Sequence, residues 1–499
     1  MKLGPQRGPS LRALATGPLD LLIIGGGIVG SGVARDAAMR GLKVGLVEQH
    51  DFAFGTSSRS SRLLHGGLRY LAQGRIGLVH EASVEKKIIH HIAPHLAQPL
   101  PFIFPTYRGN KDWVLWQLKI GVKIYDLLCG GRNLGKSTWL TPREVREQVP
   151  ALTGANLNGA VRYYDGFTND ARLTLDTLRS AAKSGASIVN YCRFNDAQGN
   201  GLWDCAVEDL LGGNKFAVRA HTIVNATGPW ADGLPHSRVK LRVTKGIHLV
   251  VERARVPVPD TVVMTEGKRI LFAIPWGERT ILGTTDTDYH GSFDDVRADE
   301  SDIRYVLQIT NQFFPSARLA SPDVISTWAG LRPLLSDPNG QPSDISRSHE
   351  ITQPEPGWWD VAGGKLTTYR RMAEQTVDQI VKGLLPAKEF KPCRTAVEPL
   401  LAAPEAGNLS GILPPEFCRG AVEHFCANEW AMHLEDVMLR RTSWHYYFQD
   451  AAQKAERVAD WMGELLGWSV AQRAAELARY RQSVGSTDAP KPQRCRPPN

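Results

Sequence analysis

The sequence predicts an α/β fold in which a Rossmann-like, doubly wound sheet is joined to a β-rich second domain and a small C-terminal helical domain. Three observations predict it. A short apolar run near the start of the chain ends at a glycine-rich turn, strand-like runs separated by turn residues fill the middle, and a linker rich in Pro, Ala and Gly precedes segments with helical periodicity. The 499 residues are enough for two or three domains with large cores.

The segment Leu19–Glu48 is the most informative part of the chain. Its pattern is strand, glycine turn, helix of small residues and second strand, and in this unit the free N–H groups of the helix point at an anion. We expect Gly25 to form the turn, Gly27 to let the backbone approach a pyrophosphate, Gly30 to let the helix pack against the strand, and Glu48 to bind a ribose. The chain is therefore expected to bind a dinucleotide.

Composition excludes several classes of protein. The seven cysteines are odd in number and contain no CxxC, which favours a reducing compartment and excludes a disulfide framework or a zinc site. The formal charge of +8 suits an anionic substrate or an anionic membrane surface. We expect no nucleic-acid partner, because no run of Lys and Arg is concentrated with aromatic residues on one element. No apolar run approaches the length that spans a bilayer.

Strand-like runs such as Ile270–Pro275 and Thr280–Thr284 predict the β-rich substrate domain, and the spacing of Ala455, Val458 and Met462 predicts an amphipathic helix near the C-terminus. The first 18 residues lack a secretory apolar core and are expected to be a loose tail. The predicted boundaries are 19–80, 160–233 and 326–385 for a discontinuous cofactor domain, 81–159 and 234–325 for the substrate domain, 386–415 for the linker, 416–482 for the helical domain, and 1–18 and 483–499 for flexible tails.

Three further segments favour FAD over NAD as the dinucleotide. Asp51–Leu71 is dense in Ser, Thr and Gly, Ala220–Asp232 is a strand ending in a Thr-Gly turn, and Val361–Tyr369 is a glycine turn that opens a helix. Their spread over three hundred residues indicates a cofactor wrapped by a whole domain. The residues expected at the FAD are Gly25, Gly27, Gly30, Glu48, Thr56, Ser57, Ser58, His65, Gly66, Gly67, Thr227, Gly228, Gly363, Gly364, Lys365, Leu366 and Thr367.

At these segments the chain resembles a known family, the aerobic, membrane-associated, FAD-dependent glycerol-3-phosphate dehydrogenases. The resemblance runs in order from about Leu19 to Leu385 and is weaker over Asn428–Thr442. It implies a FAD domain of the glutathione-reductase-2 or amino-acid-oxidase type. The motifs that carry it are GGGIVGSG, TSSRSSRLLHGGLRYL, VNATGPW, KGIHLVV, FAIPW, ILGTTDTDY, TWAGLRPL and GGKLTTYR.

The resemblance implies that sn-glycerol 3-phosphate is oxidised to dihydroxyacetone phosphate by hydride transfer from C2 to flavin N5, with electrons passed to a membrane quinone. It places substrate contacts at Arg69, Tyr70, His248, Arg332 and Lys365. The sequence supports Arg69, Arg332 and Lys365 independently of the resemblance. Each of these cations lies in a tight turn, and a phosphate dianion requires cations for its binding.

Three residues are candidates for the proton chemistry: His248, Arg332 and Lys365. His248 is the candidate base, because an imidazole with an ordinary pKa near ~6.5 is neutral at working pH. A histidine on a strand is also a common structural residue, and Arg332 or Lys365 could steer the proton instead. We expect no metal ion: Asp286–Gly291 imitates an EF-hand, but its twelfth position is Arg297.

The segment Asp112–Leu128 has tryptophans beside an apolar face and nearby lysines, which is typical of a helix at a membrane interface. A core helix with a solvated lysine face has the same composition. The family's quinone acceptor favours membrane contact, so we expect a cytoplasmic protein held peripherally at the inner face of the cytoplasmic membrane. A homodimer is one assembly that the sequence leaves open.

Other functions remain to be separated from this one. A glycerol-3-phosphate oxidase would use the same substrate and reduce O2 to H2O2. An amino-acid or 2-hydroxy-acid oxidase shares the fold, but the three cations argue against it. From a different class, a non-catalytic membrane-associated flavoprotein would need no substrate pocket.

Overall fold

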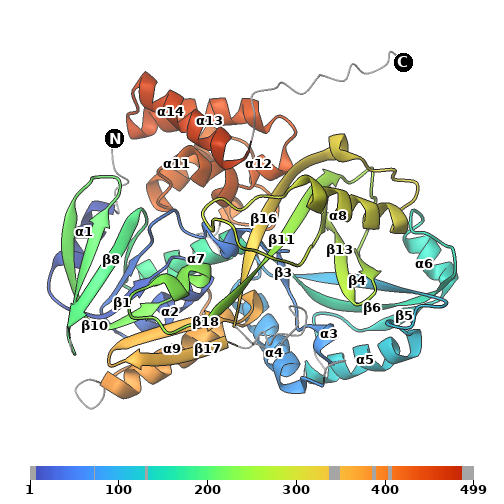
Figure 1. The fold of residues 1–499 in the computed structure, drawn as a ribbon, viewed down its shortest axis with the longest axis horizontal. Helices are drawn as coiled ribbons and strands as arrows, with labels where there is room; N and C mark the ends of the chain where they lie inside the picture. Colours follow the sequence, from blue (N-terminus) through green and yellow to red (C-terminus); the bar gives the residue numbers. More distant parts are fainter. Residues whose placement is uncertain are drawn as a thin grey trace.

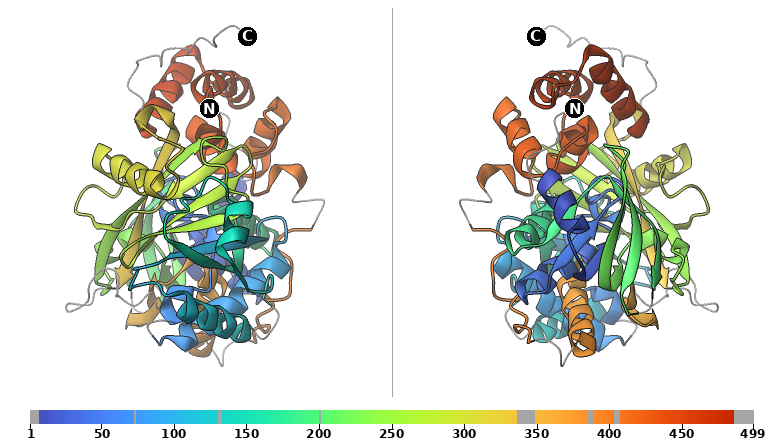
Figure 2. Two further views of the ribbon diagram at one scale, coloured as in Figure 1. Left: turned by 90° about the vertical axis from the view of Figure 1, so that its right-hand side faces the viewer. Right: turned by 90° about the vertical axis from the view of Figure 1, so that its left-hand side faces the viewer.

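The structure is a computed structural model that describes residues 7–71, 74–129, 133–199, 201–335, 349–384, 389–402 and 407–485. Two sheets lie side by side, with a group of helices from the C-terminal part of the chain packed across one end (Figures 1 and 2). The chain passes between the two sheets several times, so each sheet is built from segments far apart in sequence.

The first sheet contains the predicted dinucleotide unit. Its central strands β10, β1 and β2 are parallel neighbours, and β1 is buried, as expected for a strand covered on both faces. The order is β17 (His349–Glu355), β18 (Trp358–Gly363), β10 (Lys215–Asn225), β1 (Leu19–Ile24), β2 (Val44–Val47) and β7 (Ser187–Val189), with β9 (Trp203–Asp209) paired to β10 and β8 (Cys192–Gly199) paired to β9.

Helices α2 (Ile28–Met39), α7 (Asp170–Lys183) and α9 (Tyr369–Leu384) cover this sheet, with α2 packed between the other two. Their apolar side chains form one core with those of β1 and β2. The helix predicted after the glycine turn at 361–369 is confirmed as α9. A 3₁₀ turn at Leu366–Thr368 precedes it.

The second sheet is mostly antiparallel and strongly apolar. Its order is β15 (Thr287–Asp288), β11 (Leu241–Glu252), β14 (Arg279–Gly283), β13 (Arg269–Trp276), β12 (Thr261–Glu266), β4 (Gln98–Tyr107), β6 (Leu157–Phe167) and β3 (Leu63–Leu64), with β16 (Val324–Leu335) paired to β11 and β5 (Thr138–Leu140) paired to β6. Around it lie α3 (Leu68–Leu71), α4 (Ile76–Ile92), α5 (Leu115–Leu128), α6 (Pro142–Gln148) and α8 (Glu300–Phe313).

Three strands correct the predicted domain boundaries. The segments 19–80, 160–233 and 326–385 were assigned to the cofactor domain, yet β3, β6 and β16 pair within the second sheet. The apolar pattern of these strands is like that of the strands in the first sheet, and such a pattern does not say which sheet a strand joins.

The predicted N-terminal tail is wrong for the part that the structure describes. Helix α1 (Arg7–Ala15) packs on β7 and β10, and Leu14 is fully buried. The buried guanidinium of Arg7 donates to the Asn190 carbonyl and forms an ion pair with Asp209. Residues 1–6 lie outside the described residues.

The C-terminal helices are α11 (Arg419–Asn428), α12 (Trp444–Tyr447), α13 (Ala451–Leu466) and α14 (Val470–Ser483), with a π-helical turn at Asp436–Arg441. They form their own core, drawn in red in Figure 1. The apolar spacing that predicted α13 is confirmed. In the linker, Leu400 is buried, and its N–H donates to the Ile92 carbonyl at 2.9 Å.

Candidate active site

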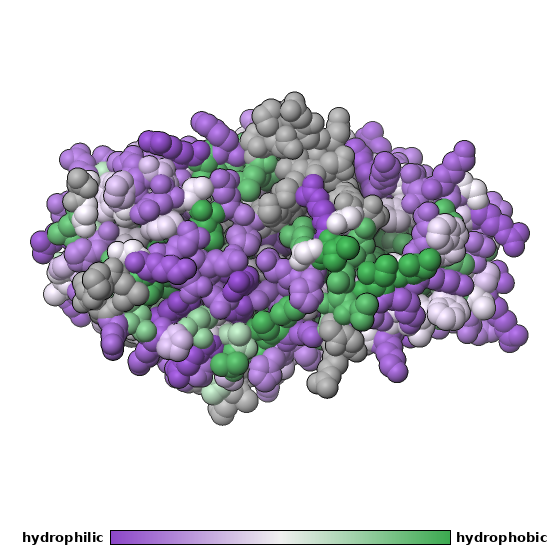
Figure 3. Space-filling model, turned by 90° about the horizontal axis from the view of Figure 1, so that it is seen from below, coloured by the Kyte–Doolittle hydropathy of each residue, from purple (hydrophilic) through white to green (hydrophobic). Residues whose placement is uncertain are grey.

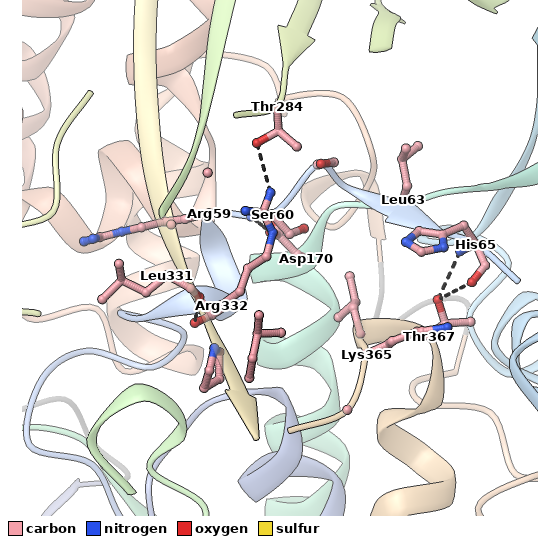
Figure 4. A pocket seen from close by; sticks show the side chains of 18 of the residues that line it. Arg59, Ser60, Leu63, His65, Asp170, Thr284, Leu331, Arg332, Lys365 and Thr367 are labelled. Carbon is pink, nitrogen blue, oxygen red and sulfur yellow. Dashed lines mark hydrogen bonds between the residues drawn. The ribbon is translucent and has the colours of Figure 1, made fainter. Parts of the chain in front are cut away.

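A cavity of about 1480 Å³ lies between the two sheets and is lined by residues of both. One end is formed by the turn between β1 and α2 and by the residues after β2 and β10. The other end is formed by β11, β16 and the turn after β18 (Figure 4). Segments that lie more than three hundred residues apart in sequence therefore share one enclosed space.

The glycines of the β1–α2 turn leave no room for side chains. Gly25 has a φ of +109°, and a Cβ there would lie 2.6 Å from the carbonyl oxygen of Ala226. A Cβ on Gly30 would lie 2.0 Å from the carbonyl oxygen of Gly25, so this glycine sets how closely α2 packs on the strand. Gly27 lines the cavity, as expected of the residue that faces a pyrophosphate.

Glu48 follows β2 directly and lines the same end of the cavity. Its carboxylate accepts hydrogen bonds from the backbone N–H groups of Gly26 at 2.7 Å and His50 at 2.8 Å. Burial raises the pKa of this carboxyl, while these two hydrogen bonds favour the charged form. Each oxygen keeps a lone pair for a ribose hydroxyl, so the turn and the acid fit the adenosine half of a dinucleotide.

The hydroxyl-rich segment after β2 lies across the cavity from the turn that follows β18. Ser57 Oγ accepts from the N–H of Ile28, the first residue of α2, at 2.9 Å, and Thr56 Oγ1 donates to the Leu331 carbonyl at 2.6 Å. His65 and Thr367 hold the two segments together: Thr367 Oγ1 accepts from the His65 N–H at 3.0 Å and donates to its carbonyl at 3.2 Å (Figure 4).

Arg332 projects from β16 into the centre of the site. Its guanidinium lies over Gly246, where a Cβ would approach Nη2 to 2.3 Å. It donates to Thr284 Oγ1 at 3.1 Å and to the Thr285 carbonyl and Asp286 Oδ1 at 3.2 Å (Figure 4). These contacts hold the planar fork at the cavity wall, where it can receive an anion.

Lys365 reaches the same space from the turn after β18. Gly363 and Gly364 precede it with φ values of +72° and +81°, a conformation that glycine adopts without strain. The Lys365 ammonium lies 4.0 Å from the centroid of the Tyr70 ring. Tyr70 belongs to α3, which begins after the His-Gly-Gly turn, so the structure brings Tyr70, Arg332 and Lys365 to one cavity.

His248 is buried on β11, with its ring stacked on Trp328 at 5.1 Å between centroids. Its Nε2 is hydrogen-bonded to Ser61 Oγ at 2.8 Å, and Nδ1 has no hydrogen-bond partner among the described residues. Burial lowers the pKa of the imidazole to about 3, and the positive charges of Arg332 and Arg62 act in the same direction. His248 is therefore neutral near pH 7.

Most, but not all, of the predicted site residues line the cavity. Gly30, Ser58 and Gly66 do not line the cavity, although each supports a segment that does. Arg69 lies on α3 between two cavity residues, but its side chain is outside the described part of the structure. The predicted residues that line the cavity are Gly25, Gly27, Glu48, Thr56, Ser57, His65, Gly67, Tyr70, Thr227, Gly228, His248, Arg332, Gly363, Gly364, Lys365, Leu366 and Thr367.

Several cavity residues were missed in the sequence. Arg59 and Ser61 fall within the hydroxyl-rich segment, which could have indicated them. Thr284 follows β14 directly, and its hydroxyl oxygen accepts a hydrogen bond from Arg332. Asp170 begins α7 and accepts from the Ser60 N–H at 2.8 Å, and burial raises the pKa of its carboxyl. Nothing in the local sequence marks Asp170.

Among the described residues, no group of three or more His, Cys, Asp and Glu side chains is arranged to hold a metal ion. Within the same residues, no helix combines the length and apolarity needed to cross a bilayer.

Comparisons with known proteins agree with this geometry. Residues 20–370 match the sequence model of the family described as FAD dependent oxidoreductase, and residues 407–473 match the C-terminal domain of alpha-glycerophosphate oxidase. A protein of Mycobacterium tuberculosis named glycerol-3-phosphate dehydrogenase 2 is 35% identical over 97% of this chain and 91% of its own length. The chain belongs to the FAD-dependent glycerol-3-phosphate dehydrogenase family.

Further relatives support this membership. The aerobic glycerol-3-phosphate dehydrogenase of Bacillus subtilis is 40% identical over 76% of this chain and 70% of its own length. The crystal structure of a glycerol-3-phosphate dehydrogenase from Bacillus halodurans, complexed with FAD, has a TM-score of 0.77 at 29% identity and covers 97% of this chain and 98% of that one. FAD is thus the cofactor of this dehydrogenase-family chain, as predicted, and the fold class is confirmed.

A solved L-alpha-glycerophosphate oxidase from Mycoplasma pneumoniae, with FAD bound, has a TM-score of 0.62 at 17% identity and covers 78% of this chain. At that identity the likeness concerns the fold alone. This chain therefore shares its fold with that oxidase.

Proposed function

We propose that this chain oxidises sn-glycerol 3-phosphate to dihydroxyacetone phosphate and passes the electrons to a membrane quinone. The observation that carries the proposal is the approach of Arg332, Lys365 and Tyr70 to one cavity that also holds the dinucleotide turn. FAD, when bound, supplies the hydride acceptor, N5 of its isoalloxazine. The protein has to bind the phosphate, place C2 and manage the hydroxyl proton.

The two cations have complementary roles in binding the phosphate. Arg332 presents a planar fork that matches two phosphate oxygens, and Lys365 adds a point charge beside the Tyr70 ring. In the free protein the Arg332 fork is partly occupied by Asp286 and the Thr285 carbonyl at 3.2 Å. A phosphate dianion would replace these neutral and singly charged acceptors with a stronger one.

His248 is our candidate for the base that accepts the proton of the substrate's hydroxyl group, with Arg332 and Lys365 as alternatives. In the free protein its pKa of about 3 makes the imidazole a weak base. One cause of that low pKa is the charge of Arg332, and a phosphate dianion on the guanidinium would oppose it. Substrate binding would therefore raise the basicity of the group that must accept the proton.

Anaerobic reduction of the flavin tests the oxidation step. Glycerol 3-phosphate added to the holoenzyme without oxygen should bleach the flavin absorbance, whereas glycerol and a 2-hydroxy acid should not. An unchanged spectrum would reject catalysis and leave the non-catalytic flavoprotein. Turnover with a quinone analogue, compared with peroxide yield in air, then separates the dehydrogenase from the oxidase that the C-terminal match also allows.

The outer face of α5 supports the proposed membrane contact. Trp116, Ile120, Ile124 and Leu127 are 61%, 53%, 42% and 73% exposed, and hydrophobic side chains gather on this lower side of the molecule (Figure 3). The ammonium groups of Lys119 and Lys123, on the same helix, lie 5.3 and 5.9 Å from the centroid of the exposed Trp139 ring, and their charge suits an anionic bilayer surface. This face supports our proposal that the protein is held peripherally at the inner face of the cytoplasmic membrane.

One predicted membrane residue is corrected. Trp113 does not belong to the exposed face, because its ring packs on Phe104 at 5.1 Å between centroids and its Nε1 donates to the Gly267 carbonyl at 2.8 Å.

The proposed membrane contact of α5 is tested by flotation of the double variant Trp116→Glu/Leu127→Glu with anionic liposomes. The wild type should float and the variant should remain in the dense fraction. Equal flotation of both would reject α5 as the contact.

A further inference from the structure

A buried polar cluster lies directly behind the His-Gly-Gly turn, and the reaction described above does not use it. It consists of Lys86 on α4, Tyr125 on α5 and Asp165 on β6, with exposed fractions of 0%, 0% and 2%. The Lys86 ammonium donates to Asp165 Oδ1 at 2.7 Å and to the Tyr164 carbonyl at 3.2 Å. A charge pair removed from water in this way is stabilising only when its geometry is well satisfied.

Tyr125 connects this cluster to the turn. Its hydroxyl donates to Asp165 Oδ1 at 2.5 Å and accepts from the Gly66 N–H at 2.8 Å. Burial and the neighbouring Asp165 raise the pKa of this phenol well above its usual range, so the O–H proton is retained and the donor role is fixed. The Gly66 N–H therefore binds a side chain from α5.

There is no space for a side chain at position 66. A Cβ at this position would lie 2.3 Å from the Tyr125 hydroxyl and 2.8 Å from Ser83 Oγ. On its other side the turn is tied to Thr367 through the backbone of His65, and it continues through Gly67, at φ +84°, into α3. The backbone of residues 65–67 is thus fixed from both sides.

The consequence lies at the substrate end of the turn. The Tyr70 N–H donates to the Gly67 carbonyl at 2.8 Å, and the Tyr70 ring lies 4.0 Å from the Lys365 ammonium. We propose that Tyr125, held by Asp165 and Lys86, is a positioning residue that fixes the 65–70 segment so that Tyr70 and Lys365 meet at the substrate. The substrate part of this inference rests on the function proposed above.

Tyr125→Phe in the FAD-loaded enzyme is the direct test, because it keeps the ring in its packing and removes only the hydroxyl. The KM for glycerol 3-phosphate should rise about five- to tenfold, the change expected when the turn loses its hydrogen bond from the Gly66 N–H to Tyr125, while kcat at saturation falls less than about twofold. Hydrogen exchange of the amides in segment 65–71 should accelerate in the same variant.

Tyr107→Phe is the matched control. Its hydroxyl is also buried in the second sheet, but it has no hydrogen-bond partner among the described residues. This variant should leave both KM and exchange unchanged. An equal rise in KM in both variants would overturn the proposal, as would a normal KM in Tyr125→Phe, with or without faster exchange.

Asp165→Asn keeps the shape of the carboxylate and replaces Tyr125→Phe if that variant does not fold. The same rise in KM is expected, and the double variant should be no worse than the more severe single one, since the groups act as a unit. If glycerol 3-phosphate fails to reduce even the wild-type flavin, the proposed function fails. Faster exchange at 65–71 in Tyr125→Phe would then still support the positioning role.

Discussion

His248 shows how burial, with the charges of Arg332 and Arg62 acting in the same direction, determines the protonation state of a single side chain. The imidazole has a pKa of about 3 in the folded chain and near ~6.5 when unfolded, so the unfolded chain binds the extra proton between these values. Stability is therefore complete above about pH 6.5 and is lost as the pH falls. This group should cost about 2 kcal/mol of unfolding free energy between pH 7 and pH 5.

The comparison of wild type with His248→Asn measures this contribution. Urea unfolding at pH 7 and pH 5 should show a smaller acid loss in the variant, because Asn does not titrate. Identical pH dependence in the two proteins would show that the buried imidazole is not the group responsible.

The two cavity cations should act mainly on substrate capture. Arg332→Ala should lower kcat/KM by about 100-fold, the loss expected for two charge-assisted hydrogen bonds, and Arg332→Lys should recover only part because a point charge does not reproduce the fork. Steady-state kinetics measure this. Arg242→Ala is the control: its pair with Asp288 lies on the same sheet but is about one third exposed, and a normal kcat/KM is expected.

Single residues were predicted best where a local rule acts. Gly25 and Gly30 follow from the geometry of a strand turning into a helix, and Glu48 follows from its place at the end of β2. Asp170 could not be found, because its position beside Ser60 depends on the pairing of β3 with β6 and no local pattern encodes that. Trp113 failed for the same reason, since Gly267 lies on a different hairpin.

Among the structural elements, the π-helical turn Asp436–Arg441 is fixed to the first sheet by a buried ion cluster. Arg440 and Arg441 both form ion pairs with Asp51, which follows β2, and Arg441 Nη2 donates to Asp51 Oδ1 at 2.8 Å. Because two guanidinium groups share one carboxylate away from water, neither can be solvated if that carboxylate is removed.

Asp51→Ala should therefore destabilise the protein by about 3–5 kcal/mol. The midpoint of urea unfolding reports the change. Arg143→Ala, which breaks an exposed pair with Glu147 on α6, should shift the unfolding free energy by less than about 0.5 kcal/mol. If Asp51→Ala lowers the unfolding free energy by less than about 1 kcal/mol, the C-terminal helices are stabilised by their apolar core and not by the ion cluster.

Periodicity located β13, β14 and α13, but it did not predict which strands pair within which sheet. β13 and β14 lie where the sequence placed strands, and α13 follows its apolar spacing. β16 falls in the segment 326–385 that was assigned to the cofactor domain, yet eleven of its residues pair with β11. Strand pairing is a long-range property, and apolar periodicity does not report it.

At the scale of the whole molecule, the cavity makes the cofactor part of the folded state. FAD that binds only the native chain should raise the free energy of unfolding with the logarithm of its concentration, by about 4 kcal/mol at a thousandfold excess over its Kd, and the unfolding temperature should rise with it. Thermal unfolding of the flavin-free protein across a series of FAD concentrations measures this. A midpoint independent of FAD would contradict a cofactor enclosed between the sheets.

The overall architecture was predictable because the β1–α2–β2 unit is local and specific, and its partner segments carry their own glycine turns. The shape of the cavity was not, because it depends on how closely the two sheets approach. That approach is set by contacts such as Thr56 to Leu331 and His65 to Thr367, each joining residues that lie far apart in the chain.

This arrangement has a consequence for biosynthesis. The ribosome delivers the β1–α2 turn first, while the cavity wall at 361–367 emerges only after most of the polypeptide has been made. A chain that has not yet reached these residues lacks one wall of the cavity. Yellow colour in a preparation would accordingly mark molecules in which both sheets have assembled around the cavity.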